Sequence, residues 1–206
     1  MIVSLFDRSQ NVLEPWARAG YSVRSYDIEP CEREMPLGPH TQCNVLDIVS
    51  LPPETRFVVA FPPCTHVAVS GARYWKSKGP NAVVQFLALW TKARSLSDGI
   101  PSVFENPIGR ASRLTGDAWS VVVNPWEFSA LSGPEDHYTK ATCLWLFHGA
   151  RAPMKAPGNF PLRKDYIHRI PPSSRRAYLR SVTPLGFSRG LFYGNISALR
   201  GPREDS

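Results

Sequence analysis

Two side chains of this 206-residue chain could together perform nucleophilic catalysis, the thiol of Cys64 and the carboxyl group of Glu105. Cys64 ends the run Phe61-Pro62-Pro63-Cys64, and Glu105 begins Glu105-Asn106-Pro107. A thiol held rigidly over a ligand crevice can act as a nucleophile where its thiolate is favoured, and a carboxyl group beside it can exchange protons with a substrate. Taken singly, Cys64 reads more often as a buried structural cysteine and Glu105 as a helix cap. The pair favours catalysis.

Short apolar segments that could be strands precede most of the polar residues of interest. Residues 1–6, 21–26, 40–46, 56–61 and 100–104 have this character, and residues 12–20 and 81–96 show the spacing of amphipathic helices. Alternating strands and helices predict a doubly wound α/β sheet, in which ligands bind beyond the carboxyl ends of the strands. Cys64, Glu105 and the acidic residues Asp27, Glu29 and Asp47 all fall at such ends.

The second half of the chain is less regular. Residues 120–128 and 140–147 predict two strands without a helix between them, which indicates a hairpin at the edge of the sheet. Residues 149–172 are rich in Pro, Gly and basic side chains and predict irregular structure. Residues 173–181 and 186–199 are expected to form closing helices. We expect one domain for the whole chain.

Positive charge is concentrated near the C-terminus. Residues 1–150 hold 13 basic and 14 acidic side chains, a net charge of −1, whereas residues 151–206 hold 11 basic and 3 acidic ones, a net charge of +8. Clustered Lys and Arg predict a polyanionic partner, for which nucleic acid is the natural candidate, although a solvated basic tail is the alternative. The expected electrostatic contacts come from Arg73, Arg151, Lys155, Arg163, Lys164 and Arg169.

Composition also bears on compartment and ligands. The four cysteines have no spacing typical of a disulfide framework or a zinc site, which favours a reducing cytoplasm and no metal. No apolar run approaches the roughly 20 residues that span a bilayer, and residues 1–6 lack the features of a signal peptide. We therefore expect a soluble cytoplasmic protein with no membrane partner.

The order of these motifs resembles the cytosine-C5 DNA methyltransferase family, in particular the short versions found in bacteriophages. Pro63-Cys64 matches the family's Pro-Cys loop after the fourth strand, and Glu105-Asn106 matches its Glu-Asn dipeptide after the fifth. Arg180-Ser181-Val182-Thr183-Pro184 resembles the family's Arg-x-x-Thr-Pro segment, and Tyr193-Gly194-Asn195 resembles its closing Gly-Asn. The resemblance spans most of the chain, from Ile2 to about Asn195, and implies host cytoplasm as the location if the gene belongs to a phage.

The resemblance implies a Rossmann-like S-adenosylmethionine-dependent methyltransferase sheet with helices on both faces and a short basic C-terminal extension. Residues 1–148 would be the catalytic core, and residues 149–206 a basic loop and closing helices that complete the same domain. Cys64 would add to C6 of cytosine, Glu105 would hold the base, and Lys140 would contact the base or its phosphate. Cofactor contacts would come from Phe6, Asp7, Asp27, Ile28, Glu29, Asp47, Pro62 and Asn195.

The chain departs from the family pattern at several positions. The first loop, which is normally glycine-rich so that backbone can approach the cofactor, reads Asp7-Arg8-Ser9-Gln10. Thr65 stands where the family usually has Gln, and Lys140 lies in the segment that replaces its Gln-x-Arg-x-Arg strand. The stretch between Phe147 and Arg180 is too short for a target-recognition domain, which predicts weak or very short sequence specificity.

Two other interpretations stay open at this stage. The same chemistry could act on a free deoxycytidine nucleotide or on RNA, because the recognition domain is missing. Alternatively, the altered first loop could belong to a catalytically silent nucleic-acid-binding protein on a methyltransferase scaffold. Retention of both Cys64 and Glu105 argues against a silent protein, since a binding module has no need for that pair.

Overall fold

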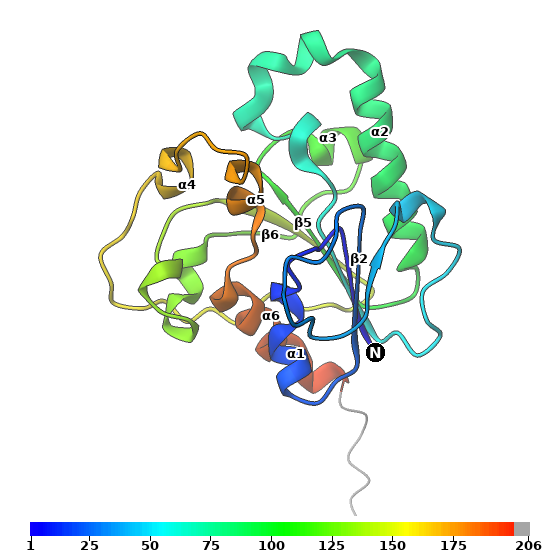
Figure 1. Cartoon of the computed structure of the whole chain (residues 1–206), viewed down its shortest axis with the longest axis vertical. Helices are drawn as coiled ribbons and strands as arrows, with labels where there is room; N and C mark the ends of the chain where they lie inside the picture. The colour runs from blue at the N-terminus through cyan, green and yellow to red at the C-terminus, as the bar shows by residue number, and fades with distance from the viewer. Residues whose placement is uncertain (200–206) are drawn as a thin grey trace, which may run out of the picture.

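The computed structural model describes residues 1–199, which form a seven-stranded sheet with helices on both faces (Figure 1). The strand order is β3-β2-β1-β4-β5-β7-β6. The first five strands of that order pair in parallel, and β7 is antiparallel to both of its neighbours. The strands in chain order are β1 Ile2–Leu5, β2 Val23–Asp27, β3 His40–Gln42, β4 Phe57–Ala60, β5 Ser102–Pro107, β6 Val121–Val123 and β7 Thr142–Phe147.

This arrangement confirms the expected Rossmann-like α/β fold. The chain builds outward from β1 to β3 and then resumes on the other side of β1 with β4, so the topological switch point lies between β1 and β4. Ligands of doubly wound sheets bind in the crevice that opens at that point. The two loops at the crevice are the turn after β1 and the loop after β4, which carries Cys64.

Hydrophobic side chains cover the sheet on both faces because residues of a strand alternate in direction. On one face, Val3, Val58 and Phe104 pack under helix α2, Trp75–Leu96, through its buried Phe86 and Trp90. The other face packs against α1, Glu14–Arg18, and α6, Leu185–Leu199. Its buried members include Ile2, Phe57, Val59, Trp16, Phe187 and Leu191.

Helix α2 is longer than the predicted helix of residues 81–96, and it is bent. Gly79 has φ 67° and ψ −177°, a conformation outside the helical region, and Pro80 follows it. Proline fits the first turn of a helix, so the straight part begins there, close to the predicted start. The preceding residues form a separate arm of the molecule at the top of Figure 1.

The remaining helices are short. They are α3 Ala111–Thr115, α4 Tyr166–Arg169 and α5 Arg176–Ser181, together with 3-10 helices at Asn11–Leu13, Val45–Asp47, Cys64–His66, Val69–Tyr74, Pro125–Leu131 and Pro134–Asp136. The closing helices expected at residues 173–181 and 186–199 are therefore present, as is the edge hairpin of β6 and β7. Within residues 1–199, no helix has the length and apolar character required to cross a membrane.

Three predicted strands differ from the observed ones. The strand expected over residues 120–128 ends at Val123, because Pro125 has no backbone N–H for pairing and begins a 3-10 helix. The strand expected over residues 40–46 ends at Gln42, and Asn44 caps the next 3-10 helix by accepting from the Leu46 N–H. Strand β5 continues through Glu105 to Pro107 by pairing with β7, so Glu105 lies within the strand.

Candidate active site

Cys64 lies at the switch point, immediately after the loop that leaves β4. It begins the 3-10 helix Cys64–His66 and is half-buried. The loop before it is fastened to β5, because the buried Asn106 side chain donates from Nδ2 to the carbonyl oxygen of Pro62 at 2.6 Å. Asn106 is the residue after Glu105, so one hydrogen bond ties the loop of Cys64 to the strand that carries Glu105.

Two main-chain hydrogen bonds also join the residues after Cys64 to the residues after β5. Val69 N–H donates to the Ile108 carbonyl at 3.0 Å, and Arg110 N–H donates to the Val67 carbonyl at 2.9 Å. The approach is so close that a Cβ atom on Gly109 would lie 2.1 Å from the Val67 oxygen, so only glycine fits. The position of Cys64 relative to Glu105 is therefore set by backbone contacts.

Glu105 projects from β5 into a pocket between the sheet edge and the chain before α6. The Thr142 hydroxyl of β7 donates to the Glu105 carboxylate. Both apolar and polar residues line the pocket. Its lining residues are Phe61, Glu105, Val123, Asn124, Pro125, Lys140, Thr142, Ser181, Thr183, Pro184 and Phe187. The structure thus places the predicted residue Lys140 in the same pocket as Glu105.

The charges around Cys64 oppose one another. Burial raises the pKa of the Cys64 thiol above its usual value, and the Glu105 carboxylate raises it further. Lys140 and Arg180 act in the opposite direction and lower that pKa. Glu105 and Lys140 line one pocket, and both act electrostatically on Cys64, which is mainly a thiol near neutral pH. Formation of the thiolate must then depend on the balance among these neighbours.

Arg180 and the chain after it were missed as site residues by sequence reasoning. The charge of Arg180 lowers the pKa of Cys64, and Ser181, Thr183 and Pro184 line the pocket. The signal was present in the Arg-x-x-Thr-Pro pattern, but the pattern alone did not show which side chains would face the site. Asn124, which also lines the pocket, accepts the Lys140 backbone N–H at 3.1 Å and carried no sequence signal.

The turn after β1 forms the other side of the switch point and contains no glycine. Phe6 and Gln10 nevertheless have φ values of 58° and 55°, in the left-handed region that glycine favours. The Gln10 side chain is fully buried, donates to Ser25 Oγ and the Gly38 carbonyl, and accepts from the Leu37 N–H. Three side-chain hydrogen bonds therefore hold a glycine-like backbone shape in place.

Two carboxyl groups lie at this turn. Asp7 is buried, and its Oδ1 accepts from the Ser9 N–H at 3.0 Å and from the Gln10 N–H at 2.9 Å. Asp27 closes β2, and its Oδ1 accepts from the Glu29 N–H at 2.9 Å. Burial raises the pKa of both groups above the usual value, and the Asp7 charge raises the pKa of Asp27 further. The pair therefore favours a neutral state or a cationic ligand.

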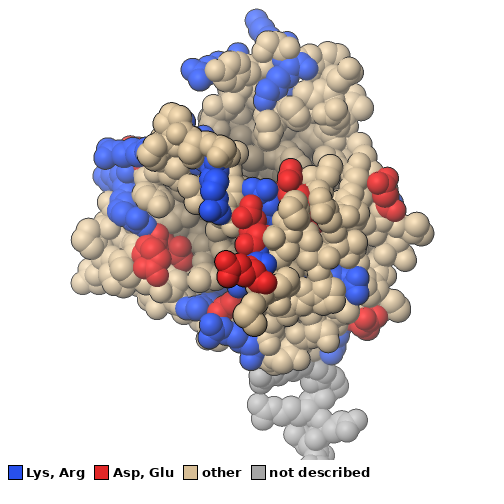
Figure 2. Space-filling view, viewed as in Figure 1, with Lys and Arg blue, Asp and Glu red and all other residues tan. Residues whose placement is uncertain are grey.

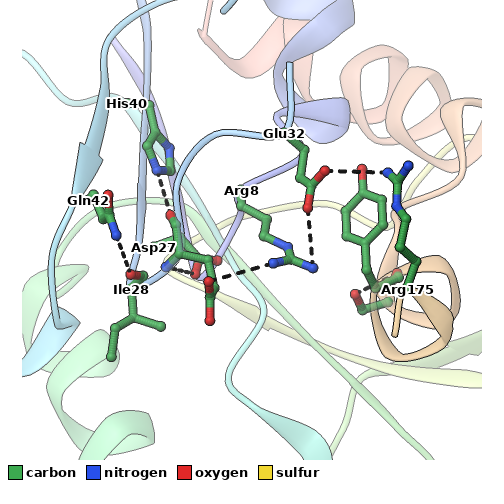
Figure 3. A network of polar contacts seen from close by, with 10 residues as sticks. Arg8, Asp27, Ile28, Glu32, His40, Gln42 and Arg175 are labelled. Atoms are coloured by element: carbon green, nitrogen blue, oxygen red, sulfur yellow. Dashed lines mark hydrogen bonds and ion pairs between the residues drawn. The ribbon is translucent and has the colours of Figure 1, made fainter. Parts of the chain in front are cut away.

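Figure 3 shows the polar network that surrounds these carboxyl groups. Arg8 pairs with Glu32 at 3.4 Å and with Glu29 at 3.9 Å, and Arg175 reaches Glu32 at 3.5 Å. The Ile28 side chain stands apart from this network and is 66% exposed. Phe6, Asp7, Asp27, Ile28 and Glu29 thus lie at the carboxyl ends of the adjacent parallel strands β1 and β2, and Glu29 pairs with Arg8.

Four other predicted cofactor and nucleic-acid residues need separate description. Pro62 is buried in the nucleophile loop, and Asp47 is exposed in the 3-10 helix after β3. Lys155 pairs with Glu127. Arg163 stacks on Tyr166, with 4.2 Å between the guanidinium carbon and the ring centre, and donates to the Glu135 carbonyl. Its guanidinium therefore supports the fold around α4.

The structure does not bring Asn195 and Arg151 to the site. Asn195 lies ten residues after the start of α6, about 15 Å along the helix axis from the pocket end. Its buried side chain forms three hydrogen bonds with main-chain groups. Oδ1 accepts from the Arg151 N–H at 2.8 Å, and Nδ2 donates to the Arg151 and Leu191 carbonyls. The Gly-Asn pattern therefore corresponds to a contact between α6 and the chain at Arg151. The predicted contact of Asn195 with the cofactor is wrong.

No family model and no curated protein matches the chain. Among solved structures, one described as a DhpI–SAM–HEP complex is similar over 70% of this chain, with 14% sequence identity and a TM-score of 0.30. This chain spans 61% of the length of that protein. The fold assignment rests on the strand order and the direction of β7.

Proposed function

We propose that this protein transfers a methyl group from S-adenosylmethionine to C5 of cytosine in DNA, with Cys64 as the nucleophile and Glu105 as the group that holds the base. The observation that carries the proposal is the fastening of the Cys64 loop to the strand of Glu105. Asn106 and Gly109 fix that register, and the charge of Glu105 reaches the thiol. A rigid thiol beside a carboxyl group is what addition to a pyrimidine requires.

The chemistry of cytosine explains why both groups are needed. C5 is a poor nucleophile until the Cys64 sulfur forms a bond to C6, which places negative charge on the ring. A Glu105 carboxyl group that donates to N3 and accepts from the exocyclic amine would stabilise that charge. S-adenosylmethionine, when bound, supplies an electrophilic methyl group to C5. Loss of the C5 proton and breakage of the S–C6 bond would then restore the Cys64 thiolate and release the methylated base.

The pocket beside Glu105 suits a planar pyrimidine. Phe61, Pro125 and Phe187 offer apolar surfaces, whereas Glu105, Lys140 and Thr142 offer polar groups at one side. Ligand sites commonly combine apolar walls with a few polar groups that fix orientation. Lys140, which also lowers the pKa of Cys64, would compensate negative charge on the ring.

The crevice at the β1 turn fits the charge of the proposed cofactor. S-adenosylmethionine carries a sulfonium and an ammonium group. Burial raises the pKa values of the Asp7 and Asp27 carboxyl groups, and a nearby cation would favour their charged forms. Within the described residues, Asp7 Oδ2 is buried and has no hydrogen-bond partner. Asp7 and Asp27 would hold the cationic part of the cofactor, and the exposed Ile28 would contact its adenine.

A methyl-transfer assay with labelled S-adenosylmethionine tests the proposal. The purified protein is incubated with duplex DNA, single-stranded DNA, RNA and dCMP, and label in each product is measured. We expect label in DNA, at the C5 position of cytosine after digestion to nucleosides. Label in dCMP alone, or in RNA alone, would contradict DNA as the substrate, and no label in any product would contradict the methyltransferase assignment.

A further inference from the structure

An arm of the molecule formed by residues 69–78 stands beside the nucleophile loop. It comprises the 3-10 helix Val69–Tyr74 and the first turn of α2, and it ends at the bend of Gly79. Lys78 Nζ donates to the Thr65 carbonyl at 2.6 Å, and the Arg110 guanidinium lies 4.5 Å from the Trp75 ring centre. The arm is thus anchored to the residue that follows Cys64.

The arm is basic and carries exposed apolar side chains. It contains Arg73, Lys76 and Lys78 and no acidic residue. Val69 is 57% exposed and Tyr74 48% exposed, and Ile108, whose carbonyl accepts from the Val69 N–H, is 46% exposed. Such a surface beside Cys64 suits nucleic acid whose bases are unstacked. Bases stack on aromatic rings, and Lys and Arg attract the phosphates.

A second basic surface lies on the opposite side of the site. It consists of α4, α5 and their flanking residues 163–181, which we call the α4–α5 lobe. These residues include six basic side chains and one acidic one, Asp165. Lys164 and Arg169 are exposed, and Arg180 reaches close enough to Cys64 to lower its pKa. Arg175 is drawn toward Glu32.

Figure 2 shows how these two surfaces are related. Lys and Arg side chains appear on the upper lobe, where Figure 1 places the arm, and on the left lobe, where it places α4 and α5. The surface is hollowed between them. Acidic side chains on this face appear below the hollow in the middle of the view, on the lower part of the left lobe and at the right edge.

We propose that the arm and the α4–α5 lobe are the two rims of a groove that holds a DNA strand over Cys64. Phosphates would contact Arg73 and Lys76 on one rim and Lys164 and Arg169 on the other, while unstacked bases next to the target would meet Val69 and Tyr74. This inference rests on the proposed function. Two charged rims outside the pocket suit a polymer, since the single phosphate of a mononucleotide cannot contact both.

Salt-dependent DNA binding tests the groove. Fluorescence anisotropy of a labelled single-stranded oligonucleotide is measured with the Cys64→Ser protein, so that no covalent adduct forms, over a range of about 50–200 mM salt. Each lost phosphate contact lowers the slope of log K against log [salt] by roughly 0.7 for a single strand. We expect the pairs Arg73→Gln with Lys76→Gln, and Lys164→Gln with Arg169→Gln, to reduce the slope by about 1.4 each.

The matched control removes two charges from the other edge of the sheet. Arg56 precedes β4, and Arg151 lies at the far end of α6, so Arg56→Gln with Arg151→Gln changes the net charge equally without touching either rim. We expect its slope to equal that of the parent. Equal losses in the control and the rim variants, or unchanged slopes in the rim variants, would overturn the groove.

The same rim substitutions, made in the protein that keeps Cys64, separate this inference from the proposed function. Rim-dependent binding by a protein that methylates no substrate would leave the groove standing and overturn the methyltransferase. If the two rim double variants methylated DNA at the parental rate at 200 mM salt, the groove would be overturned and the methyltransferase assignment would stand. Circular dichroism melts of each variant establish that folding is retained.

Discussion

The nucleophile loop and the turn after β1 flank the same switch point, yet they are held by opposite means. The nucleophile loop lies so close to residues 108–110 that a glycine is required at Gly109, and main-chain hydrogen bonds do most of the holding. The β1 turn has the backbone shape of a glycine loop but no glycine, and the buried Gln10 side chain holds it. Close packing therefore requires glycine at position 109, whereas side-chain hydrogen bonds require glutamine at position 10.

This difference teaches that a missing glycine does not mean a missing turn. A non-glycine residue in the left-handed region costs of order 1–3 kcal/mol, which persists only where the surroundings over-determine it. Three hydrogen bonds from one buried side chain meet that condition at Gln10. The variants below test whether the two loops differ as described, starting with the nucleophile loop.

Removal of the nucleophile should have the largest effect. Cys64→Ser should lower methyl transfer at least about 10³-fold, because a hydroxyl is a far weaker nucleophile than a thiolate. Cys31→Ser, which changes a free cysteine that does not line the Glu105 pocket, is the control and should transfer methyl at the parental rate. The rates come from the labelled-cofactor assay, and comparable activity of both variants would remove Cys64 from the mechanism.

Neutralising Glu105 should separate chemistry from thiol reactivity. Glu105→Gln should lower methyl transfer roughly 10²- to 10⁴-fold, the usual contribution of a general acid or base. The same change should lower the pKa of Cys64, because the Glu105 carboxylate raises it. Alkylation of Cys64 by iodoacetamide near pH 8 should therefore become faster. Slower alkylation would show that the two groups are not coupled as the structure indicates.

Restoring a glycine to the β1 turn should destabilise it. Gln10→Gly relieves the left-handed strain but removes a fully buried side chain and leaves the partly buried Leu37 N–H and Gly38 carbonyl without their partner. Unsatisfied buried groups cost about 1–3 kcal/mol each, so we expect a net loss of about 2–4 kcal/mol in the free energy of unfolding. Urea denaturation measures this loss, and a stabilised variant would contradict the role given to Gln10.

Replacing a required glycine beside the Cys64 loop should also destabilise the protein. Gly109→Ala places a Cβ 2.1 Å from the Val67 carbonyl oxygen and should cost about 1–3 kcal/mol, with a matching fall in methyl transfer as the loop shifts. Gly71→Ala is the matched control, because its Cβ would lie 3.7 Å from the nearest atom, the Thr65 carbonyl oxygen. Urea denaturation and the transfer assay should distinguish the two variants, and equal effects would argue against close packing at Gly109.

The smallest effect concerns pH. Burial raises the pKa of Asp7 above its unfolded value, so the folded state binds the proton more tightly. Its contribution to stability is therefore full below the unfolded pKa and is lost as pH rises through the folded pKa. Asp7→Asn should flatten the dependence of unfolding free energy between about pH 4 and pH 7, leaving the similar contribution of Asp27. An unchanged pH dependence would contradict the burial effect.

The sequence predicted the elements whose patterns are local. Strands, the α2 region, the edge hairpin and the closing helices follow from periodicity. Placement of Cys64 and Glu105 at one edge of the sheet follows from the order of the strands, whereas Lys140 was predicted only from the family resemblance. Long-range contacts could not be predicted in this way. The extension of β5 depends on pairing with β7, the burial of Gln10 depends on Leu37 and Gly38, and the use of Asn195 depends on Arg151.

The nucleic-acid contacts illustrate the same limit. A count along the chain placed the positive charge in residues 151–206, but the fold disperses those residues. Arg151 lies beside the C-terminal half of α6, Lys155 is paired with Glu127, and Lys164 and Arg169 are exposed in the α4–α5 lobe. The arm of residues 69–78, from the nearly neutral half, lies beside Cys64. Net charge by segment therefore did not predict which basic side chains share a surface.

Covalent trapping tests the central claim most directly. DNA containing 5-fluorocytosine is incubated with the protein and S-adenosylmethionine, and the mixture is analysed by denaturing gel and by mass spectrometry of digested peptides. Because fluorine at C5 cannot leave as a proton does, the S–C6 bond should persist, and we predict a stable adduct on the peptide that contains Cys64. The adduct should be absent with Cys64→Ser and retained with Cys31→Ser. A folded protein that methylates cytosine yet forms no adduct, or an adduct on another residue, would contradict the account.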